Sequence, residues 1–550
     1  MQIAKVHIEN FRSIAECDIE FTSLTAIIGA NNTGKSNILL ALKRVLAGDW
    51  VNASTFSESD VRGHDPDRDI VIEVTLDPPL QYRRYKEASA VSIGCLRFAF
   101  TRYKKGDKAG QRRIEQMCLS PAGKQVAVPT SAPKKGQQLK FEPLLGIPPE
   151  VRQAIPVVYV GVDRSVRNQL PGARNSLLRL LLQDIVESFE GEACIAESED
   201  ATAAEGASRS ERFSEAMTVV MGLLRTDEFN DLEATIKAKS LEQLGFDPTV
   251  DEDMLDLYFA PLEPMDFYKN LDLRVREGEC AVSATELGGG VQNAIVMAIL
   301  QAFEQRRKKG AVLLIEEPEM FLHPQMQRSL YKTLRDISSR NQVICTTHSP
   351  HFIRVEEYQE VRLVTKTEDG TAVAASSLER TTARVEKLRK ELDPERAEMF
   401  FASRVLFVEG DTEKLALPEY AKRLNIDLDR AGATVVEVGG KRNLQEMALI
   451  AKSFGIPVGI LFDSDTKNSD DECLNRELLG LGDASTQTWA CEPDYEAEVK
   501  AAMGDSEYEA ACSRHPGLRK PVKARLIAAE PESAIPAKVE QALRWLGRSD

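Results

Sequence analysis

Residues 24–46 have the sequence LTAIIGANNTGKSNILLALKRVL. The segment begins as an apolar strand, passes through a loop that fits the pattern G-x-x-x-x-G-K-[ST], and continues into an apolar helix. Such a loop turns backbone N–H groups toward phosphate oxygens, while its lysine reaches the outer phosphates and its last hydroxyl ligates Mg²⁺. The stretch therefore predicts an ATP site that consists of Gly29, Asn31, Asn32, Thr33, Gly34, Lys35, Ser36 and Asn37.

Three later segments fit the other parts of an ATPase site. The apolar strand in AVLLIEEPEMFLHP ends in Glu316 and Glu317. We expect Glu316 to hold Mg²⁺ through water and Glu317 to orient the attacking water. A second buried strand, in ICTTHSPHF, leads to His348, which is placed to sense the γ-phosphate. In ATELGGGVQNAIVMAIL, a glycine turn with Gly289 opens an apolar helix, which is another phosphate-facing N-terminus.

Together these four elements, with a long insert among them, resemble the ABC-type ATPase head shared by SMC-like DNA repair proteins. The resemblance implies a dimer in which Gly289 closes on the ATP of the other subunit. The sequence departs from the usual LSGGQ signature, because Gly288 or Gly289 replaces its serine, and Glu316 replaces the usual Asp. We therefore expect slow hydrolysis through Glu317. Asp60, in FSESD, is either a metal-contacting loop residue of such heads or an ordinary surface-loop residue, and we favour the surface loop.

A second acidic pattern begins near residue 404. The strand in RVLFVEGDTEKLAL leads to Glu409, Gly410 permits a sharp exit and Glu413 begins a helix, while PVGILFDSDTKN repeats the device with Asp463 and Asp465. In a parallel sheet, both strands place their carboxyl ends on one edge, so these acids can converge. Such a cluster repels itself and raises its own pKa values unless a divalent cation is bound, and oxygen ligands suit Mg²⁺ or Mn²⁺.

The two strand ends, E-G-x-T-E and D-x-D, are similar to those of the TOPRIM domain of topoisomerases and primases. Members of that family usually have a third acid in D-x-D-x-D, where this sequence has Lys467, so one ligand must come from elsewhere. Glu492 and Glu496, in TWACEPDYEAEV, are four residues apart. If this segment is helical they share one face of the helix and can complete a second metal site.

An ABC-type head with a helical insert, followed by a TOPRIM unit, is similar to the OLD (overcoming lysogenization defect) family of nucleases, which includes prokaryotic anti-phage enzymes. The resemblance covers nearly the whole chain. It implies a DNA endonuclease that uses two metal ions at Glu409, Asp463 and their neighbours, and an ATPase that sets the shape or assembly of the dimer. It also implies a basic residue near the C-terminus, for which Lys520 in LRKPVKARLI matches best and Lys523 is the alternative. A cation there stabilises charge in the transition state.

The periodicity of the chain predicts an α/β fold in five parts. The ABC-type ATPase head is formed by residues 1–164, with the Walker A loop, and residues 256–370, with the signature, Walker B and His switch. Between them, residues 165–255 form a helical insert that carries more apolar residues than a solvated arm requires. Similar inserts in the OLD family dimerise, and a self-contained core is the alternative. Residues 371–399 form a linker helix, and residues 400–550 form the TOPRIM nuclease domain.

Composition narrows the possible functions. The chain of 550 residues is too long for one core. It has no apolar run of about 18 residues and no signal-peptide pattern, so we expect a cytoplasmic protein without a membrane partner. Its net charge of −16 repels DNA at long range, so DNA contact requires bound metals or local basic stretches, such as residues 102–113 and 514–525. For residues 102–113, a solvated loop is the alternative.

Three other functions fit parts of the pattern. The first is an ATP-driven, SMC-like DNA clamp without nuclease activity, which Lys467 would favour. A topoisomerase needs a tyrosine nucleophile on a separate DNA-gate domain, and neither Tyr495 nor Tyr508 lies in one. A primase usually has a zinc module, which the nine scattered cysteines without a C-x-x-C pair do not provide. The OLD resemblance implies DNA as substrate, a homodimer or higher oligomer and, for several members, a helicase partner.

Overall fold

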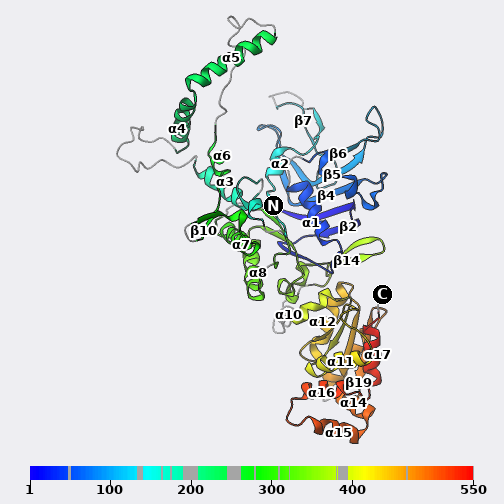
Figure 1. The fold of residues 1–550 in the computed structure, drawn as a ribbon. Helices are drawn as coiled ribbons and strands as arrows, with labels where there is room; N and C mark the ends of the chain where they lie inside the picture. Colours follow the sequence, from blue (N-terminus) through cyan, green and yellow to red (C-terminus); the bar gives the residue numbers. More distant parts are fainter. Residues whose placement is uncertain are drawn as a thin grey trace. The chain divides into compact units, whose positions relative to one another are not determined.

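The computed structural model describes residues 1–47, 51–132, 140–162, 165–173, 176–189, 209–244, 262–277, 280–306, 310–320, 322–379, 381, 394–465 and 469–548. The chain divides into two compact units. The first consists of Met1–Val162 and Gly310–Asp550, and the second of Asp163–Lys309. Figure 1 shows their elements coloured along the sequence. The five-part division at residues 164, 255, 370 and 399 stays a proposal.

A six-stranded sheet of the first unit carries the glycine loop. Its strands lie in the order β15-β14-β3-β13-β12-β9, and every pair is parallel except that of β14 with β15. All residues of β3, β12 and β13 are buried, as expected for parallel strands that are covered on both faces. The strands are β3 (Leu24–Ile28), β9 (Val157–Val160), β12 (Val312–Glu316), β13 (Gln342–Thr346), β14 (Val361–Thr367) and β15 (Gly370–Ala374).

A second, antiparallel sheet has the order β2-β1-β4-β5-β6 and shares one hydrophobic core with the first sheet and helix α1. Ile8 of β1, Leu42 of α1 and Ile344 of β13 all belong to this core and are fully buried. The elements are β1 (Gln2–Phe11), β2 (Ile14–Glu20), α1 (Lys35–Leu46), β4 (Ile70–Tyr82), β5 (Val91–Arg102), β6 (Arg112–Leu119), the β7 (Ala127–Pro129) and β8 (Phe141–Pro143) pair, α2 (Pro149–Gln153) and α8 (Pro324–Ser338).

The C-terminal part of the first unit is a four-stranded, fully parallel sheet in the order β17-β16-β18-β19. The predicted alternation of strands and helices after residue 400 is therefore confirmed. Helix α17 packs against β16, β18 and β19 (Figure 1). The elements are α10 (Pro394–Ala397), β16 (Arg404–Val408), α11 (Asp411–Arg423), β17 (Ala433–Glu437), α12 (Lys441–Ser453), β18 (Val458–Asp463), α13 (Ser469–Gly480), β19 (Thr486–Cys491), α14 (Tyr495–Met503), α15 (Asp505–Arg514), α16 (Lys520–Ala529) and α17 (Ala537–Leu546).

The second unit is mainly helical, as the periodicity after residue 165 predicts. Helix α3 packs against α6 and α7. Its elements are α3 (Leu177–Phe189), α4 (Arg209–Leu224), α5 (Asp227–Leu244), α6 (Pro264–Tyr268), β10 (Arg274–Glu277), β11 (Cys280–Ser283) and α7 (Gly289–Arg306). Of the predicted linker helix at 371–399, residues 382–393 lie outside the described residues, as does Lys467, and residues 371–374 belong to strand β15 instead. Among the described helices, none combines the length and apolar character needed to span a bilayer.

Candidate functional site

The glycine loop lies between β3 and α1, and its two glycines are required by their surroundings. Gly29 has φ 142°, and a Cβ on it would lie 2.1 Å from the carbonyl oxygen of Val364. Gly34 has φ 109°, and a Cβ on it would lie 2.3 Å from Thr371 Oγ1. Any other residue at these positions would be strained. Lys35 Nζ donates to two carbonyl oxygens of the loop at 2.9 and 2.7 Å, and burial lowers its pKa.

The remaining predicted ATP ligands follow the same loop into the helix. They are Asn31, Asn32, Thr33, Ser36 and Asn37. Asn37 Nδ2 donates to Ser13 Oγ at 2.8 Å, and Ser13 Oγ shares a hydrogen bond of 2.8 Å with Thr371 Oγ1. Thr371 Oγ1 donates to the carbonyl oxygen of Thr33 at 2.9 Å. The sequence analysis missed Ser13 and Thr371, because nothing local in the sequence relates either residue to the loop.

The acids after β12 lie close to His348. Tyr159 Oη donates to Glu316 Oε2 at 2.8 Å, which orients this buried carboxylate. Glu317 follows with φ 41°, a left-handed conformation that is uncommon for a non-glycine residue. His348 Nε2 lies 3.8 Å from Glu317 Oε1. Burial, and then the charge of Lys35, lower the pKa of His348, so the imidazole is neutral near pH 7.

Glu319 is a residue of this edge that the sequence analysis did not single out. Its Oε1 accepts a hydrogen bond of 2.6 Å from the backbone N–H of His348, and burial raises its pKa. Glu319 therefore ties the segment after β12 to the segment after β13. The sequence signal was the third acid of E-E-P-E, which the turn after Glu316 and Glu317 brings back toward the sheet.

The signature glycines belong to the second unit. Gly289 is the first residue of α7, and Gly288 precedes it. A Cβ on either glycine would meet no atom within 4 Å in the part of the chain that the structure describes. Packing within one chain therefore does not require glycine at these positions.

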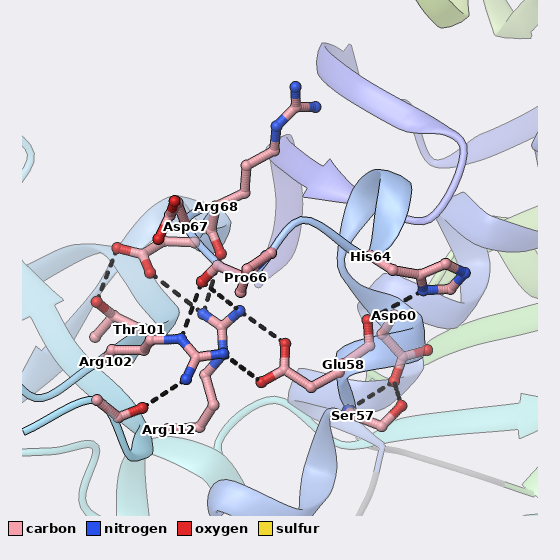
Figure 2. Close-up of polar contacts among 12 residues, drawn as sticks. Ser57, Glu58, Asp60, His64, Pro66, Asp67, Arg68, Thr101, Arg102 and Arg112 are labelled. Carbon is pink, nitrogen blue, oxygen red and sulfur yellow. Dashed lines mark hydrogen bonds and ion pairs between the residues drawn. The ribbon is translucent and has the colours of Figure 1, made fainter. Parts of the chain in front are cut away.

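Asp60 is buried, so its interpretation as a surface-loop residue is wrong. Its side chain accepts hydrogen bonds from Arg12 Nε at 2.9 Å and from the backbone N–H and Oγ of Ser57, each at 3.0 Å, and Arg44 Nη2 lies 3.8 Å away. Figure 2 shows Asp60 beside Ser57. Burial alone would raise the pKa of Asp60, but the hydrogen bonds from Ser57 and Arg12 hold it below its usual value. These partners occupy the carboxylate and give it a structural role.

We expect Asp60→Ala to lower the free energy of unfolding by about 1–3 kcal/mol, because it leaves buried donors unsatisfied. ATP binding by the folded protein should be unchanged. Urea unfolding and titration with a fluorescent ATP analogue measure the two quantities, and the exposed Asp67→Ala is the matched control. Normal stability combined with lost ATP binding would contradict the structural role.

The basic stretch at residues 102–113 uses its arginines within the molecule. Arg112 donates to both carboxylate oxygens of Glu58 at 2.9 Å, and Arg102 Nη2 donates to Glu58 Oε1 at 2.8 Å (Figure 2). Arg113 pairs with Glu115. The exposed cations of this stretch are Lys104, Lys105 and Lys108. A DNA contact at this stretch would therefore depend on lysines.

The second acidic site forms at the carboxyl edge of the C-terminal sheet. Glu409 follows β16, and Asp463 ends the neighbouring strand β18. The backbone N–H of Asp463 donates to Glu409 Oε1 at 2.8 Å, and that of Tyr495 donates to Asp463 Oδ1 at 2.8 Å. Glu413 lies in the first turn of α11, where its Oε2 accepts a hydrogen bond of 3.2 Å from the N–H of Gly410.

Glu409, Glu413 and Asp463, called the inner acids below, have the self-repulsion that the sequence predicts. Burial, reinforced by the charge of Asp463, raises the pKa of both Glu409 and Glu413 to about 7. The pKa of Asp463 is also raised, first by burial and then by the charges of Asp494 and Asp465. Among the described residues, no lysine or arginine forms a salt bridge with Glu409, Glu413 or Asp463. Lys441 Nζ donates to the backbone carbonyl oxygen of Asp463, so a lysine lies beside these acids, but among the described residues none is paired with their carboxylates.

Each of the three outer acids faces a lysine. Asp465 Oδ1 lies 3.7 Å from Lys441 Nζ, and Glu496 Oε1 lies 2.6 Å from Lys520 Nζ. Glu492 Oε1 lies 3.8 Å from the Nζ of Lys538. The charge of Lys520 also opposes the rise in the pKa of Asp463, and its contact with Glu496 brings this lysine to the same edge.

Glu492 and Glu496 do not share a helix face, so this prediction is wrong. Helix α14 begins at Tyr495, and Glu492 precedes it, with Pro493 and Asp494 between. Proline cannot donate to the helix, and Asp494 instead caps it, accepting from the N–H of the third helical residue at 2.8 Å. The sequence analysis missed Asp494, although its charge acts on Asp463. The available sequence signal for a helix start was Asp494 itself, an N-cap residue type followed by the acids Glu496 and Glu498 in the first turn.

The chemistry of the inner acids fits a hard divalent cation. Mg²⁺ and Mn²⁺ prefer carboxylate oxygens, and the buried Glu413 and the half-buried Glu409 and Asp463, which have no salt bridge among the described residues, would gain from such a charge. In the described part of the chain, the set of three ligand atoms that lie within 4.8 Å of one another comes from His7, Glu9 and Glu16 instead. His7 already contacts Glu9 at 2.8 Å and Asp18 at 3.0 Å. The inner acids share an edge but are less compact than that set.

We expect the metal-free protein to lose stability from about pH 5 to about pH 8 through Glu409 and Glu413. Their pKa values near 7 lie above the ordinary 4.5, so the folded state holds more protons than the unfolded state and weakens as pH rises through this window. In EDTA, the melting temperature of a Glu409→Gln/Glu413→Gln double variant should exceed that of the wild type by an amount that increases with pH. A constant difference across this window would contradict the raised pKa values.

Comparison with known proteins gives matches over both parts of the chain. Residues 1–136 and 153–353 match the family described as AAA ATPase domain. Residues 400–465 match the family described as overcoming lysogenization defect protein-like, TOPRIM domain. The chain is 28% identical to the OLD nuclease of Thermus scotoductus over 86% of this chain and 85% of that protein. It is 26% identical to the Old nuclease of Escherichia phage P2, over 84% and 77%, and 24% identical to endonuclease GajA of Bacillus cereus strain VD045, over 88% and 78%.

Proposed function

We propose that this chain, which belongs to the OLD family of ATPase-linked nucleases, cuts DNA by metal-dependent phosphodiester hydrolysis. The chain belongs to the AAA ATPase domain family over more than half of its length, and an OLD-like TOPRIM domain follows. The predicted order of an ATPase head followed by a TOPRIM domain, in an α/β fold, is confirmed by these matches. The single observation that supports the proposal most is the group formed by the buried Glu413 and the half-buried Glu409 and Asp463, which have no salt bridge to a cation in the described structure.

The inner acids would hold the ions, and Asp465, Glu492 and Glu496 are the further ligands we propose at the same edge. Mg²⁺ or Mn²⁺ held by these residues would supply water activation near neutral pH and stabilisation of the leaving oxygen, and a pair of ions would provide both. Lys520 stabilises the negative charge that gathers on the scissile phosphate. Its contact with Glu496 places this cation beside the proposed ligands.

The ATP site regulates or assembles the enzyme in our proposal. Lys35 binds the outer phosphates, and Ser36 and Glu316 hold the Mg²⁺ of ATP. Glu317 orients the attacking water for hydrolysis, and His348, which lies 3.8 Å from it, senses the γ-phosphate. Both lie after neighbouring parallel strands, so one nucleotide end can reach both.

Gly289 completes the nucleotide site of the other subunit in a homodimer or higher oligomer. The open space around this glycine supports the contact in trans. The exposed apolar face of α4 supports dimerisation through the helical insert; Leu223, for example, is 76% exposed. We further propose a cytoplasmic role in phage defence or DNA processing, with a helicase as a possible partner of the kind the OLD resemblance implies.

Incubation of the purified protein with supercoiled plasmid tests the function. We expect nicked and linear products with Mn²⁺ or Mg²⁺ and none with EDTA. The second candidate, an SMC-like clamp without nuclease activity, predicts DNA binding without products. The desolvation of Glu409, Glu413 and Asp463, without a salt bridge in the described part of the chain, favours the nuclease, since a chain without metal chemistry gains nothing from that cost. Binding without any cleavage across both metals would contradict the proposal.

A further inference from the structure

A cavity of about 390 Å³ lies in the C-terminal part of the chain, between helices α11, α14, α15 and α16. Its apolar wall contains three aromatic rings, those of Tyr420, Tyr495 and Tyr508, together with Val499 and Ile527. Tyr420 and Tyr495 are almost fully buried. Their hydroxyl groups face each other, and that of Tyr420 also faces Ser533, although neither hydroxyl group reaches normal hydrogen-bond geometry within the described structure. The cavity therefore offers the partly exposed ring of Tyr508, backed by two buried tyrosine rings whose hydroxyl groups are weakly paired.

One edge of the cavity is positively charged. Lys520 and Lys523 both line it, one turn apart on α16, and Glu496 from α14 faces Lys520 at 2.6 Å. An aromatic interior with two lysines at one edge matches a planar, uncharged group that carries an anion at one end. A nucleotide within a DNA strand has this form, with a base and a flanking phosphate.

Tyr495 connects the cavity directly to the acidic edge. Its backbone N–H donates to Asp463 Oδ1 at 2.8 Å, while its ring lines the cavity. Lys520 makes the same connection electrostatically, since it lines the cavity and its charge acts on Asp463. An occupant of the cavity would therefore sit next to the phosphate held at the acids.

We propose that this cavity receives one nucleobase of the DNA substrate, adjacent to the scissile phosphate. The volume lies within the range of small-ligand sites, roughly 300–1,000 Å³. A base can enter only after it leaves the duplex stack, so the enzyme should prefer single-stranded, frayed or distorted DNA. This inference rests on the proposed nuclease function and specifies its substrate.

Cleavage of end-labelled oligonucleotides with one abasic position each tests the proposal. For the wild type, one position next to the mapped cut should raise KM by about fivefold or more, the effect expected when one stacked base is lost. Tyr508→Ala removes an aromatic wall, so this variant should show a similar increase in KM on intact DNA. An abasic position next to the cut should then have little further effect on its KM. Ala524→Trp, which fills the cavity, should act in the same way, whereas Tyr508→Phe keeps the ring and should retain the abasic sensitivity.

The control is Val522→Ala, an exposed residue of the same helix that does not line the cavity. Melting temperature and ATP hydrolysis report whether each variant is folded. If the wild type cleaves the intact oligonucleotide and every abasic oligonucleotide equally well, the nucleobase site is overturned while the nuclease function stands. Failure of the wild type to cut any oligonucleotide would instead reject the nuclease function. Competition by free deoxynucleoside monophosphate without any abasic effect would overturn the proposal in favour of a free nucleotide.

Discussion

Glu409→Gln should reduce metal-dependent DNA cleavage by at least about 100-fold, the scale on which loss of one charge-stabilising group slows an enzyme. The substitution keeps the shape of the side chain and can still accept the N–H of Asp463, but it removes a negative charge from the ion site. Nicking of supercoiled plasmid in Mn²⁺ measures the effect, and Mn²⁺ binding by calorimetry should weaken in parallel.

Two comparisons make this result specific. ATP binding should be unchanged, because the glycine loop is formed by β3, α1 and their neighbours. Glu507→Gln, at an exposed position of α15, removes the same charge elsewhere in the domain and should cleave as the wild type does. If Glu409→Gln nicks plasmid at the wild-type rate, the assignment of the TOPRIM acids is wrong.

Glu317→Gln should slow ATP hydrolysis by about 100-fold or more while ATP binding persists. The side chain would lose the carboxylate that accepts the proton of water, a contribution of general base catalysis of roughly 10²–10⁴-fold. The position after β12 and the 3.8 Å distance to His348 both support this role. Phosphate release under saturating ATP, with a separate equilibrium binding measurement, separates the two steps.

Lys35→Ala provides the contrast for Glu317→Gln. Lys35 lies in the loop itself, so its loss should remove ATP binding as well as hydrolysis. A plasmid assay on both variants then shows whether bound ATP or its hydrolysis controls DNA cutting. Equal loss of ATP binding in both variants would contradict the role of Glu317 as a base.

The strands of the two parallel sheets could be predicted because each is a short apolar run between turns. β3, β12 and β13 are buried throughout, and β16 and β18 almost throughout. Such strands are mostly apolar whichever strands lie beside them in the sheet, so they can be recognised from the sequence. Burial of a charged group is different. Asp60 lies in a polar segment, and its burial depends on Arg12 and Arg44, from other parts of the chain, as well as on the nearby Ser57.

The sequence by itself determined the two sheet edges that carry the proposed chemistry, because a parallel strand fixes which end its last residue occupies. The glycine loop, Glu317 and Glu409 were all found in this way. Tertiary structure alone decided which side chains meet at these edges, since hydrogen bonds such as Ser13 to Thr371 join residues far apart in the chain. It also decided which acids face a lysine and which do not, and it formed the tyrosine-lined cavity beside them, because salt bridges and cavities arise only when separate helices pack together.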